Sequence, residues 1–315
     1  MKKINIWLPV LSIILAIALD IFVEDSGKHI KAKHPYLVYL LIILCIFFVA
    51  VAILSYFNEK TRTWIVEKAL FYAVAVLFLN FLNLITKKFT LLPIIYFPTF
   101  DKIFGVIFEE RNFLALCLTS SGKLLITGYI FGAIAGFVTG ISVGFSKWTS
   151  YWVNPIVRIL GPIPSTAWIP IVLISFPTTF SASAFLIALA VWFPTTVMTS
   201  SGIANIQNAY FEVSSTLGAG KYYQIFKVGV PAAMPHMFIG LFNGTCASFI
   251  TLMTAEMLGV KNGIGWYINW QKDMMAYANV YAGLIIIAVT FSILITILFR
   301  ARDKVLVWQK GVIKW

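Results

Sequence analysis

Charged side chains are scarce in this sequence. Asp, Glu, Lys and Arg together make up 11% of its 315 residues, whereas 60% of the residues are hydrophobic. A soluble domain carries about 25% charged residues. With so few charges the chain cannot cover a globular surface that faces water, so lipid must cover it instead. The composition excludes an ordinary soluble protein and predicts a membrane protein.

Cysteine and histidine are also rare, with three residues of each type. The cysteines lie far apart in apolar runs: Cys45, Cys117 and Cys246. We expect them to be small buried hydrophobic side chains. The histidines form no H-E-x-x-H pattern, and none lies mid-span with a carboxylate partner: His29, His34 and His236. The sequence therefore predicts no catalytic residue and no metal site.

Basic residues outnumber acidic ones and give a net charge of +12. They sit at the ends of apolar segments and not on one contiguous stripe. We therefore interpret the excess as a sign of membrane topology, and we expect lipid rather than nucleic acid as a partner.

Long apolar segments dominate the chain. A helix that crosses the hydrocarbon needs about 20 apolar residues. Eight segments meet this measure: 5–23, 36–57, 67–86, 112–144, 155–176, 182–200, 236–259 and 279–299. The first follows a charged start, as in a signal peptide, but no small-residue cleavage site follows it, so we expect a retained span. The sequence thus predicts an all-α polytopic membrane protein with about eight transmembrane helices.

The charges at the two ends of the chain indicate its orientation. Eight spans place both termini on one side, and both termini are basic: Lys2, Lys3, Arg300, Arg302, Lys304, Lys310 and Lys314. We expect both termini in the cytoplasm, and with them the polar segment 205–235. The bias is imperfect, because this orientation places five lysines outside: Lys28, Lys31, Lys33, Lys87 and Lys88.

Glycine recurs at every fourth position of the fourth span. The residues are Gly128, Gly132, Gly136, Gly140 and Gly144. This spacing places them on one helix face, where another backbone can approach closely. Two interpretations remain open, a helix–helix seam inside one subunit and a seam between two copies of the chain.

Prolines and neutral polar residues interrupt the fifth span. Prolines at membrane depth need neighbours that satisfy the freed carbonyl groups, so this helix is either a kinked structural element or part of a gated pathway.

Glu256 lies near the end of the seventh span. Its carboxyl group either snorkels to the membrane interface or caps a helix, or it lines the outer mouth of a pathway. The pathway candidates are Pro162, Pro164, Ser165, Thr166, Trp168 and Glu256.

The polar segment 205–235 predicts two short amphipathic helices joined at a glycine. Asn208 is the expected N-cap, Gly218 or Gly220 ends the first helix, and Lys221–Val228 forms the second. Pro231 then opens the next span. This hairpin would expose a cluster of apolar side chains: Phe211, Leu217, Tyr222, Tyr223 and Phe226. Such a cluster indicates a docking surface for a soluble partner, and the alternative is a re-entrant hairpin in the membrane interface.

The same segment resembles the EAA loop of ABC importer permeases, in which Glu-Ala-Ala is followed by Gly and then by Ile-x-Leu-Pro. The matching residues are Glu212–Ser214, Gly218 and Val228–Pro231. The chain departs from the pattern at four positions of similar size: Val213, Ser214, Val228 and Val230. Three further segments resemble the nitrate/sulfonate/taurine/bicarbonate branch of type I permeases: PIPSTAWIPI (162–171), AEMLG (255–259) and NGIGW (262–266).

The resemblance spans residues 92–310 and implies a type I permease core. It divides the chain into two extra N-terminal helices (1–57), a core-leading helix with an external segment (58–110), and the core (111–315). Since the family-like part begins after residue 57, we expect the core to assemble without the first two helices. The implied function is that of a multi-pass permease in the inner or plasma membrane, which imports a small anion (of the sulfonate, nitrate or bicarbonate type) or a vitamin precursor.

The resemblance also implies partners. They are two copies of an ABC ATPase, a second permease subunit that forms a homodimer with this one, and an external substrate-binding protein. The chain has no G-x-x-x-x-G-K-[ST] loop, so ATP would be bound by the ATPase subunits and this chain would hold no cofactor. The residues implied in ATPase coupling are Phe211, Glu212, Val213, Ser214, Leu217, Gly218, Tyr222 and Pro231.

Two other functions fit the sequence less well. An ion-driven secondary transporter usually shows paired broken helices in related halves or charges at the membrane midplane, and the sequence has no such repeat and few such charges. An intramembrane enzyme needs a catalytic constellation at membrane depth, and no histidine supplies one. We therefore expect a transport subunit and not an enzyme.

Overall fold

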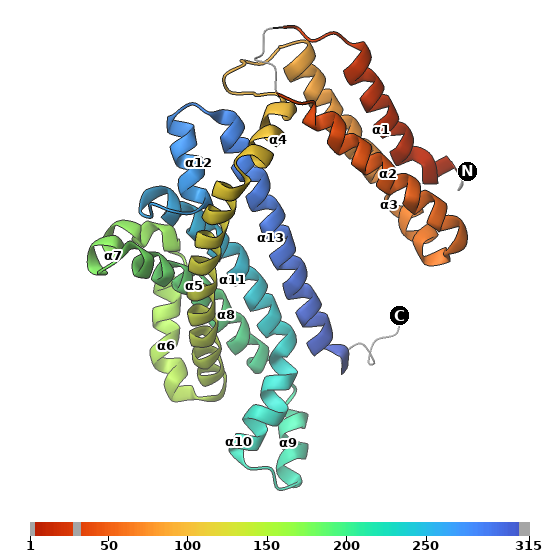
Figure 1. Cartoon of the computed structure of the whole chain (residues 1–315). Coiled ribbons are helices and arrows are strands. Elements are labelled where there is room, and N and C mark those ends of the chain that lie inside the picture. Colours follow the sequence, from red (N-terminus) through yellow and green to blue (C-terminus); the bar gives the residue numbers. More distant parts are fainter. Residues whose placement is uncertain (1–3, 28–32, 309–315) are drawn as a thin grey trace. The chain divides into compact units, whose positions relative to one another are not determined.

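The computed structural model describes residues 4–27 and 33–308, and its ribbon is shown in Figure 1. Within these ranges every regular element is a helix, which confirms the all-α prediction. The elements are α1 (Ile4–Phe22), α2 (Tyr36–Phe57), α3 (Glu59–Asn83), the π-helix η1 (Leu84–Lys88), α4 (Phe100–Glu109), α5 (Arg111–Phe145), α6 (Lys147–Leu160), the 3₁₀-helix η2 (Ser165–Trp168), α7 (Ile169–Ser175), α8 (Thr179–Ala204), α9 (Asn208–Thr216), α10 (Lys221–Tyr223), the π-helix η3 (Gln224–Gly229), α11 (Val230–Leu258), α12 (Ile264–Asp273) and α13 (Tyr277–Val305). Six basic residues used in the topology argument lie outside the described residues: Lys2, Lys3, Lys28, Lys31, Lys310 and Lys314.

Six helices of the described chain are long and apolar enough to cross a membrane. They are Tyr36–Phe57, Glu59–Lys88, Arg111–Phe145, Thr179–Ala204, Lys221–Leu258 and Tyr277–Val305. The pair α6 and η2–α7 would make a seventh span, and the apolar part of α1, Ile6–Phe22, is shorter. A helix therefore occupies each of the eight predicted positions, but the number of full-length spans is six or seven.

The predicted fifth span, 155–176, is not one kinked helix. It is bent by 85° at a break between α6 and η2. Proline has no N–H group to donate to the carbonyl one turn earlier, so Pro162 and Pro164 end the helix at Leu160, although Gly161 still has helical backbone angles. Pro155 lies inside α6, and Pro170 occupies the first turn of α7, where a missing N–H is tolerated.

The chain divides into two compact units. The first contains α1 to α4 and the segment Trp270–Ala282. In it α1, α2 and α3 pack side by side around a core of apolar side chains that includes Ile6, Ile13, Leu41, Phe48 and Ile65. Both of the extra N-terminal helices thus pack against α3, which follows them in the chain.

Ion pairs tie the elements of this first unit together. The Nζ atom of Lys87, on η1, lies 3.2 Å from Oδ1 of Asp20 and 2.9 Å from Oδ2 of Asp101. The Nζ atom of Lys88 lies 2.7 Å from Oδ1 of Asp25, and its side chain is only 3% exposed. Asp101 also accepts a hydrogen bond from the N–H group of Leu37, at the start of α2. Lys87 and Lys88 therefore join helices to one another rather than facing lipid head groups.

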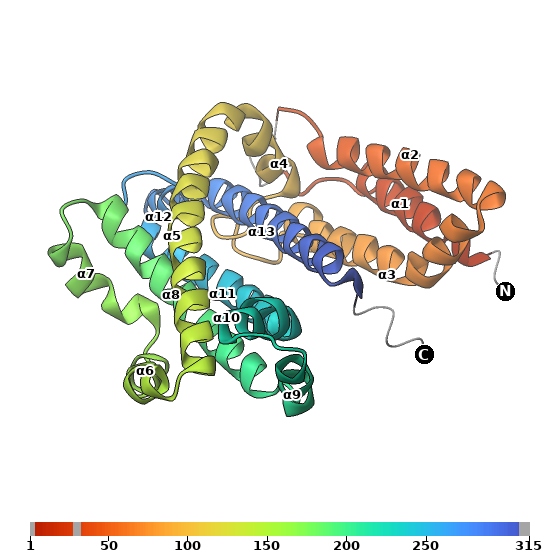
Figure 2. The ribbon, with the colours of Figure 1, turned by 90° about the horizontal axis from the view of Figure 1, so that it is seen from below.

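The second unit runs from Phe113 to Asn269 and resumes at Gly283. Its long helices α5, α8 and α11 lie side by side, and the short helices α9 and α10 lie at one end of them (Figures 1 and 2). The three cysteines of the chain are free and none is exposed, which agrees with their expected role as apolar side chains.

The glycine face of α5 packs on α8 of the same chain. A Cβ atom added at Gly128, Gly136 or Gly140 would lie 2.6 Å from the Cβ atoms of Ile187, Thr195 and Thr199, respectively. At Gly132 and Gly144 the corresponding distances, to Val191 and Ile203, are 2.8 Å. Real side chains cannot approach so closely, so all five positions need glycine. The structure thus shows the first of the two interpretations, a seam inside one subunit.

Candidate functional site

The polar segment forms a helical hairpin at the end of the second unit. Its first helix, α9, begins after Gln207, whose backbone is extended and whose side chain makes no capping bond. The expected N-cap, Asn208, is already helical, so that prediction is wrong by one residue. Glu212 is the fifth residue of α9 and lies beyond the first turn.

Gly218 ends α9 in the left-handed conformation predicted for it, with φ of +81°. Its N–H group donates to the carbonyl of Ser215 at 2.9 Å, and the next N–H group, of Ala219, donates to Ser214 at 3.0 Å. No atom lies within 4 Å of a Cβ placed on Gly218. Glycine is therefore needed here for its backbone conformation and not for close packing.

The second half of the hairpin continues directly into a membrane helix. From Lys221 the chain runs through α10 and η3 into α11 and can be treated as a single span that ends at Leu258. The helix expected over Lys221–Val228 is therefore present as α10 and η3, and Pro231 opens α11 as predicted, but the expected separation between this helix and the span is wrong. A displacement of the hairpin would be transmitted along this helix.

A glutamine missed by the sequence argument closes the hairpin. The Nε2 atom of Gln224 donates to Oγ of Ser215 at 2.7 Å and to the carbonyl of Ala219 at 3.3 Å. The first bond joins η3 to α9. Gln224 was the only amide in the predicted second helix, and it could have been noticed for that reason.

The predicted coupling residues divide into two groups. Leu217 and Tyr222 are each 82% exposed, and Val213 is also exposed. Tyr223 and Phe226, expected in the exposed apolar cluster, are exposed as well. Phe211 was expected to be exposed, but it is half-buried because its ring packs edge-on against Phe145, with centroids 6.1 Å apart. Ser214 is buried, and Glu212 is exposed without an ion pair to any described residue.

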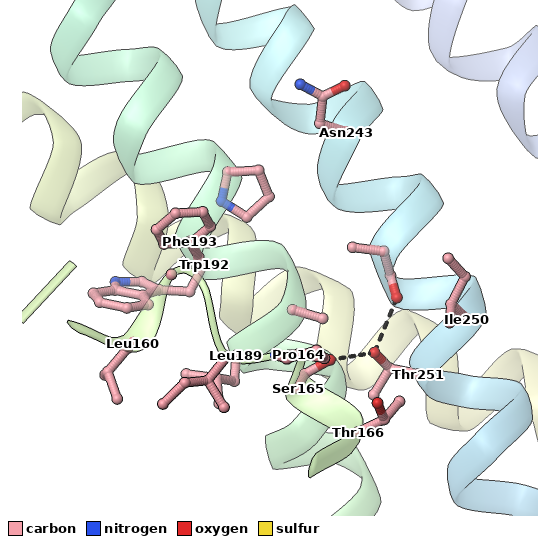
Figure 3. Close-up of a pocket in the computed structure, with 15 residues that line it drawn as sticks. Leu160, Pro164, Ser165, Thr166, Leu189, Trp192, Phe193, Asn243, Ile250 and Thr251 are labelled. Carbon is pink, nitrogen blue, oxygen red and sulfur yellow. Dashed lines mark hydrogen bonds between the residues drawn. The ribbon is translucent and has the colours of Figure 1, made fainter. Parts of the chain in front are cut away.

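A second candidate site is the cavity at the break between α6 and η2, which Figure 3 shows. Its volume is about 290 Å³, and it is lined by residues between Leu160 and Thr166, by α8 and by α11. Ser165 and Thr251 form a hydrogen bond of 2.6 Å across it, in which either hydroxyl group could donate. The other polar side chains that line the cavity are those of Thr166, Trp192 and Asn243. No charged residue lines this cavity.

Only half of the predicted pathway residues meet there. Pro164, Ser165 and Thr166 line the cavity, whereas Pro162 lines a neighbouring hollow beside Arg158. Trp168 is half-buried, and its Nε1 atom has no hydrogen-bond partner among the described residues.

The remaining candidate, Glu256, lies away from this cavity. It is 1% exposed, and its Oε2 atom accepts a hydrogen bond of 2.7 Å from the N–H group of Gly265. Glu256 is therefore a cap at the start of α12, and it does not snorkel. Sequence reasoning overlooked Asn243 and Thr251, although both are polar residues inside an apolar span.

A serine in α5 matches a hydrolase pattern by chance. The residues Gly140–Gly144 read G-x-S-x-G, which marks a nucleophile only at a sharp turn between a strand and a helix. Here the pattern lies inside α5, and the Oγ atom of Ser142 donates to the carbonyl of Val138 at 2.7 Å. This serine is therefore a helical side chain bonded to its own backbone.

Comparison with known proteins gives consistent similarities. Residues 128–306 match the family described as binding-protein-dependent transport system inner membrane component. The chain is 31% identical over 184 residues to the aliphatic sulfonates transport permease SsuC of Bacillus subtilis, covering 58% of this chain and 67% of that one. It is 31% identical to the nitrate import permease NrtB of Leptolyngbya laminosa (53% and 62% covered) and 27% identical to the taurine permease TauC of Escherichia coli (44% and 50% covered).

A solved structure has the same fold. An inward-facing form of the MetNI methionine ABC transporter aligns with a TM-score of 0.52 and 18% identity, covering 62% of this chain and 98% of that chain. The chain spans between half and about two thirds of the length of the three relatives named above.

Proposed function

Since the chain belongs to the family of binding-protein-dependent inner membrane transport components, we propose that it forms the solute pathway of an ATP-driven ABC importer. The family is one of membrane permeases and not of enzymes. Its members work with an ATPase and a substrate-binding protein. This chain would be driven by cytoplasmic ATPase subunits through the hairpin 205–235.

The observation that carries this proposal is the structure of the hairpin. The left-handed turn at Gly218 presents Leu217 and Tyr222 at its tip, each 82% exposed. Two large apolar side chains at the end of a polar segment suit a groove on a soluble partner. Because the hairpin is continuous with α11, a rigid-body movement of the ATPase would tilt α11 and change the cavity that Thr251 and Asn243 line.

The substrate that we propose is a small oxyanion. The relatives carry names that refer to sulfonates, taurine and nitrate. The cavity beside Ser165 offers neutral hydroxyl and amide groups, so an anion could pass without being held by an opposite charge. Solute would arrive from an external binding protein.

The proposed assembly contains two copies of this chain and two ATPase subunits that bind the ATP. This stoichiometry gives each ATPase one hairpin to engage. Both termini and the hairpin would face the cytoplasm, where ATP is available, and the loop Gly259–Gly263 would face the outside.

Thiol chemistry tests this arrangement. In a background without the three native cysteines, Leu217→Cys should cross-link to the co-expressed ATPase, and Asn262→Cys should not. An impermeant thiol reagent should label Asn262→Cys in intact cells and Gly220→Cys only after the cells are opened. Labelling of Gly220→Cys from outside would overturn the importer function, because the hairpin could not then meet an ATPase.

A further inference from the structure

The second unit contains a polar hollow that shares no lining residue with the cavity beside Ser165. It has a volume of about 400 Å³, and its polar lining residues are Ser120, Lys123, Thr179, Glu256, Lys261 and Asn262. It lies where α8 begins and α11 ends, whereas the coupling hairpin lies where α8 ends. With a rise of 1.5 Å per residue, the 26 residues of α8 separate the two by about 39 Å. We call it the Lys123–Lys261 hollow.

Its two lysines are unpaired. Lys123 and Lys261 are both exposed, and neither forms an ion pair with any residue in the described ranges. In the first unit, by contrast, Lys87 and Lys88 are each paired with aspartates. Two free ammonium groups that line one concave surface create a positive potential which concentrates anions there.

Neutral donors and the carboxyl group of Glu256 complete the polar lining. Ser120 and Thr179 bring hydroxyl groups, and Asn262 brings an amide. An oxyanion such as a sulfonate accepts hydrogen bonds from all of these groups, and charge-assisted bonds from ammonium groups are the stronger ones. The two ammonium groups outnumber the single carboxyl group, of Glu256, whose Oε2 atom already accepts from Gly265. The lining therefore fits a small oxyanion better than a cation or an apolar molecule.

The buried carboxyl group of Glu256 holds the loop that carries Lys261 and Asn262. Its Oε2 atom accepts a hydrogen bond from the N–H group of Gly265, just beyond this loop. Gly263, inside the loop, has φ of +118° and leaves no room for a Cβ atom beside the same carboxyl group. Glu256 is thus a positioning residue, which keeps one lysine facing the hollow while α5 supplies the other.

We propose that the Lys123–Lys261 hollow is a receiving site, on the face opposite the coupling hairpin, for the oxyanion group of the transported solute. The inference rests on the proposed function, because it takes the solute to enter from that face. The positive charge lies at the mouth, whereas the cavity beside Ser165 and Thr251 has no charged lining residue. Solute would be concentrated at the mouth and then pass through a neutral pathway that does not trap it.

Saturation-transfer NMR on the full chain in phosphatidylcholine nanodiscs tests this site at low salt. Methanesulfonate should receive saturation from the protein, and tetramethylammonium, which also carries methyl protons but a positive charge, should not. The Lys123→Gln/Lys261→Gln double variant should bind methanesulfonate at least about fivefold more weakly, because both opposite charges are lost. Lys123→Arg/Lys261→Arg, which keeps both charges, should bind it nearly as well as the natural chain.

The matched control is Lys60→Gln/Lys147→Gln, which removes two exposed lysines that do not line the hollow. It should leave methanesulfonate binding unchanged. If the Lys123→Gln/Lys261→Gln variant does not fold, each single Lys→Gln variant should lose part of the signal. Equal binding by the natural chain and by the variants of the hollow would overturn the receiving site.

Lipid head groups offer the same oxyanion chemistry as the solute. If methanesulfonate binding vanishes when phosphatidylglycerol is added to the nanodiscs, lipid occupies the hollow and the receiving site is overturned. Binding that persists supports a solute site. The measurement uses neither ATP nor an ATPase, so a failure of the coupling experiment above would overturn the proposed function without affecting this result, and the reverse also holds.

Discussion

The N–H group of Gly265 donates a hydrogen bond of 2.7 Å to the Oε2 atom of Glu256, nine residues earlier in the chain. A Cβ atom added to Gly265 would lie 2.9 Å from the Cβ atom of Glu256, so the two backbones meet at a distance that only glycine permits. The end of α11 and the start of α12 are thereby joined through one buried carboxyl group.

Replacing Glu256 by alanine should destabilise the protein. The buried N–H group of Gly265 would lose its acceptor, which costs about 1–3 kcal/mol. Glu256→Gln retains an acceptor oxygen and should cost less. Thermal unfolding of the purified chain measures both, with Glu212→Gln as the control, since Glu212 is exposed and makes no ion pair with the described residues. Equal midpoints for Glu256→Ala and the natural chain would contradict the cap.

Gly218 and Gly220 form a matched pair for testing the hairpin turn. At both positions no atom lies within 4 Å of the place that a Cβ atom would take, but φ is +81° at Gly218 and −68° at Gly220. Valine at Gly218 should strain the backbone by about 1–2 kcal/mol and abolish ATP-driven uptake while membrane insertion persists. Valine at Gly220 should be tolerated. Uptake assays in vesicles distinguish the two, and normal uptake by Gly218→Val would argue against the coupling role.

Gln224→Leu should loosen the hairpin. The change removes the bonds to Ser215 and Ala219, each of which contributes about 0.5–1.5 kcal/mol. Hydrogen exchange of the α9 amides should become faster. The control is Gln207→Leu, because the side chain of Gln207 makes no capping bond to α9. Unchanged exchange in Gln224→Leu would show that the turn at Gly218 alone holds the hairpin.

The seam between α5 and α8 should reject even a methyl group. At Gly136 an added Cβ atom would lie 2.6 Å from the Cβ atom of Thr195, so Gly136→Ala should cost about 1–3 kcal/mol through overpacking. Gly122, on the same helix, has nothing within 4 Å of that position, and Gly122→Ala should be neutral or slightly stabilising. The yield of folded chain and its unfolding temperature should be lower for Gly136→Ala than for Gly122→Ala. Equal values for the two variants would contradict the close packing of α5 on α8.

Deletion of residues 1–57 should damage α3 rather than leave the core intact. The deletion removes Asp20 and Asp25 and leaves the side chain of Lys88, now 3% exposed, without its ion partners. The backbone carbonyls of Asp20 and Val23 that accept from this ammonium group are deleted too, so the charge would be left unpaired on the apolar surface of the membrane unit, where ionised side chains are unfavourable. Adding Lys87→Met and Lys88→Met to the deletion should recover part of the folded chain in size-exclusion chromatography. If the chain with the deletion alone folds as well as the full chain, the core assembles without residues 1–57, as the extent of the family-like region predicts.

Local pattern accounts for the class of protein and for most helix positions. Apolar length placed helices at all eight expected segments, because hydrocarbon requires each span to satisfy its own backbone bonds. The spacing of Glu212, Gly218 and Pro231 indicated the hairpin, and the left-handed turn at Gly218 followed from a property of glycine itself. These features depend on residues close together in the chain, so sequence alone can reveal them.

Contacts between distant segments needed the folded structure. Ser165 meets Thr251, 86 residues away, and Asp20 meets Lys87, 67 residues away. No periodicity predicts such pairs, because they depend on how helices lie against one another. The same holds for the cap that Glu256 provides and for the continuity of the hairpin with α11, since a proline signals where a helix can begin but not whether a preceding turn joins it.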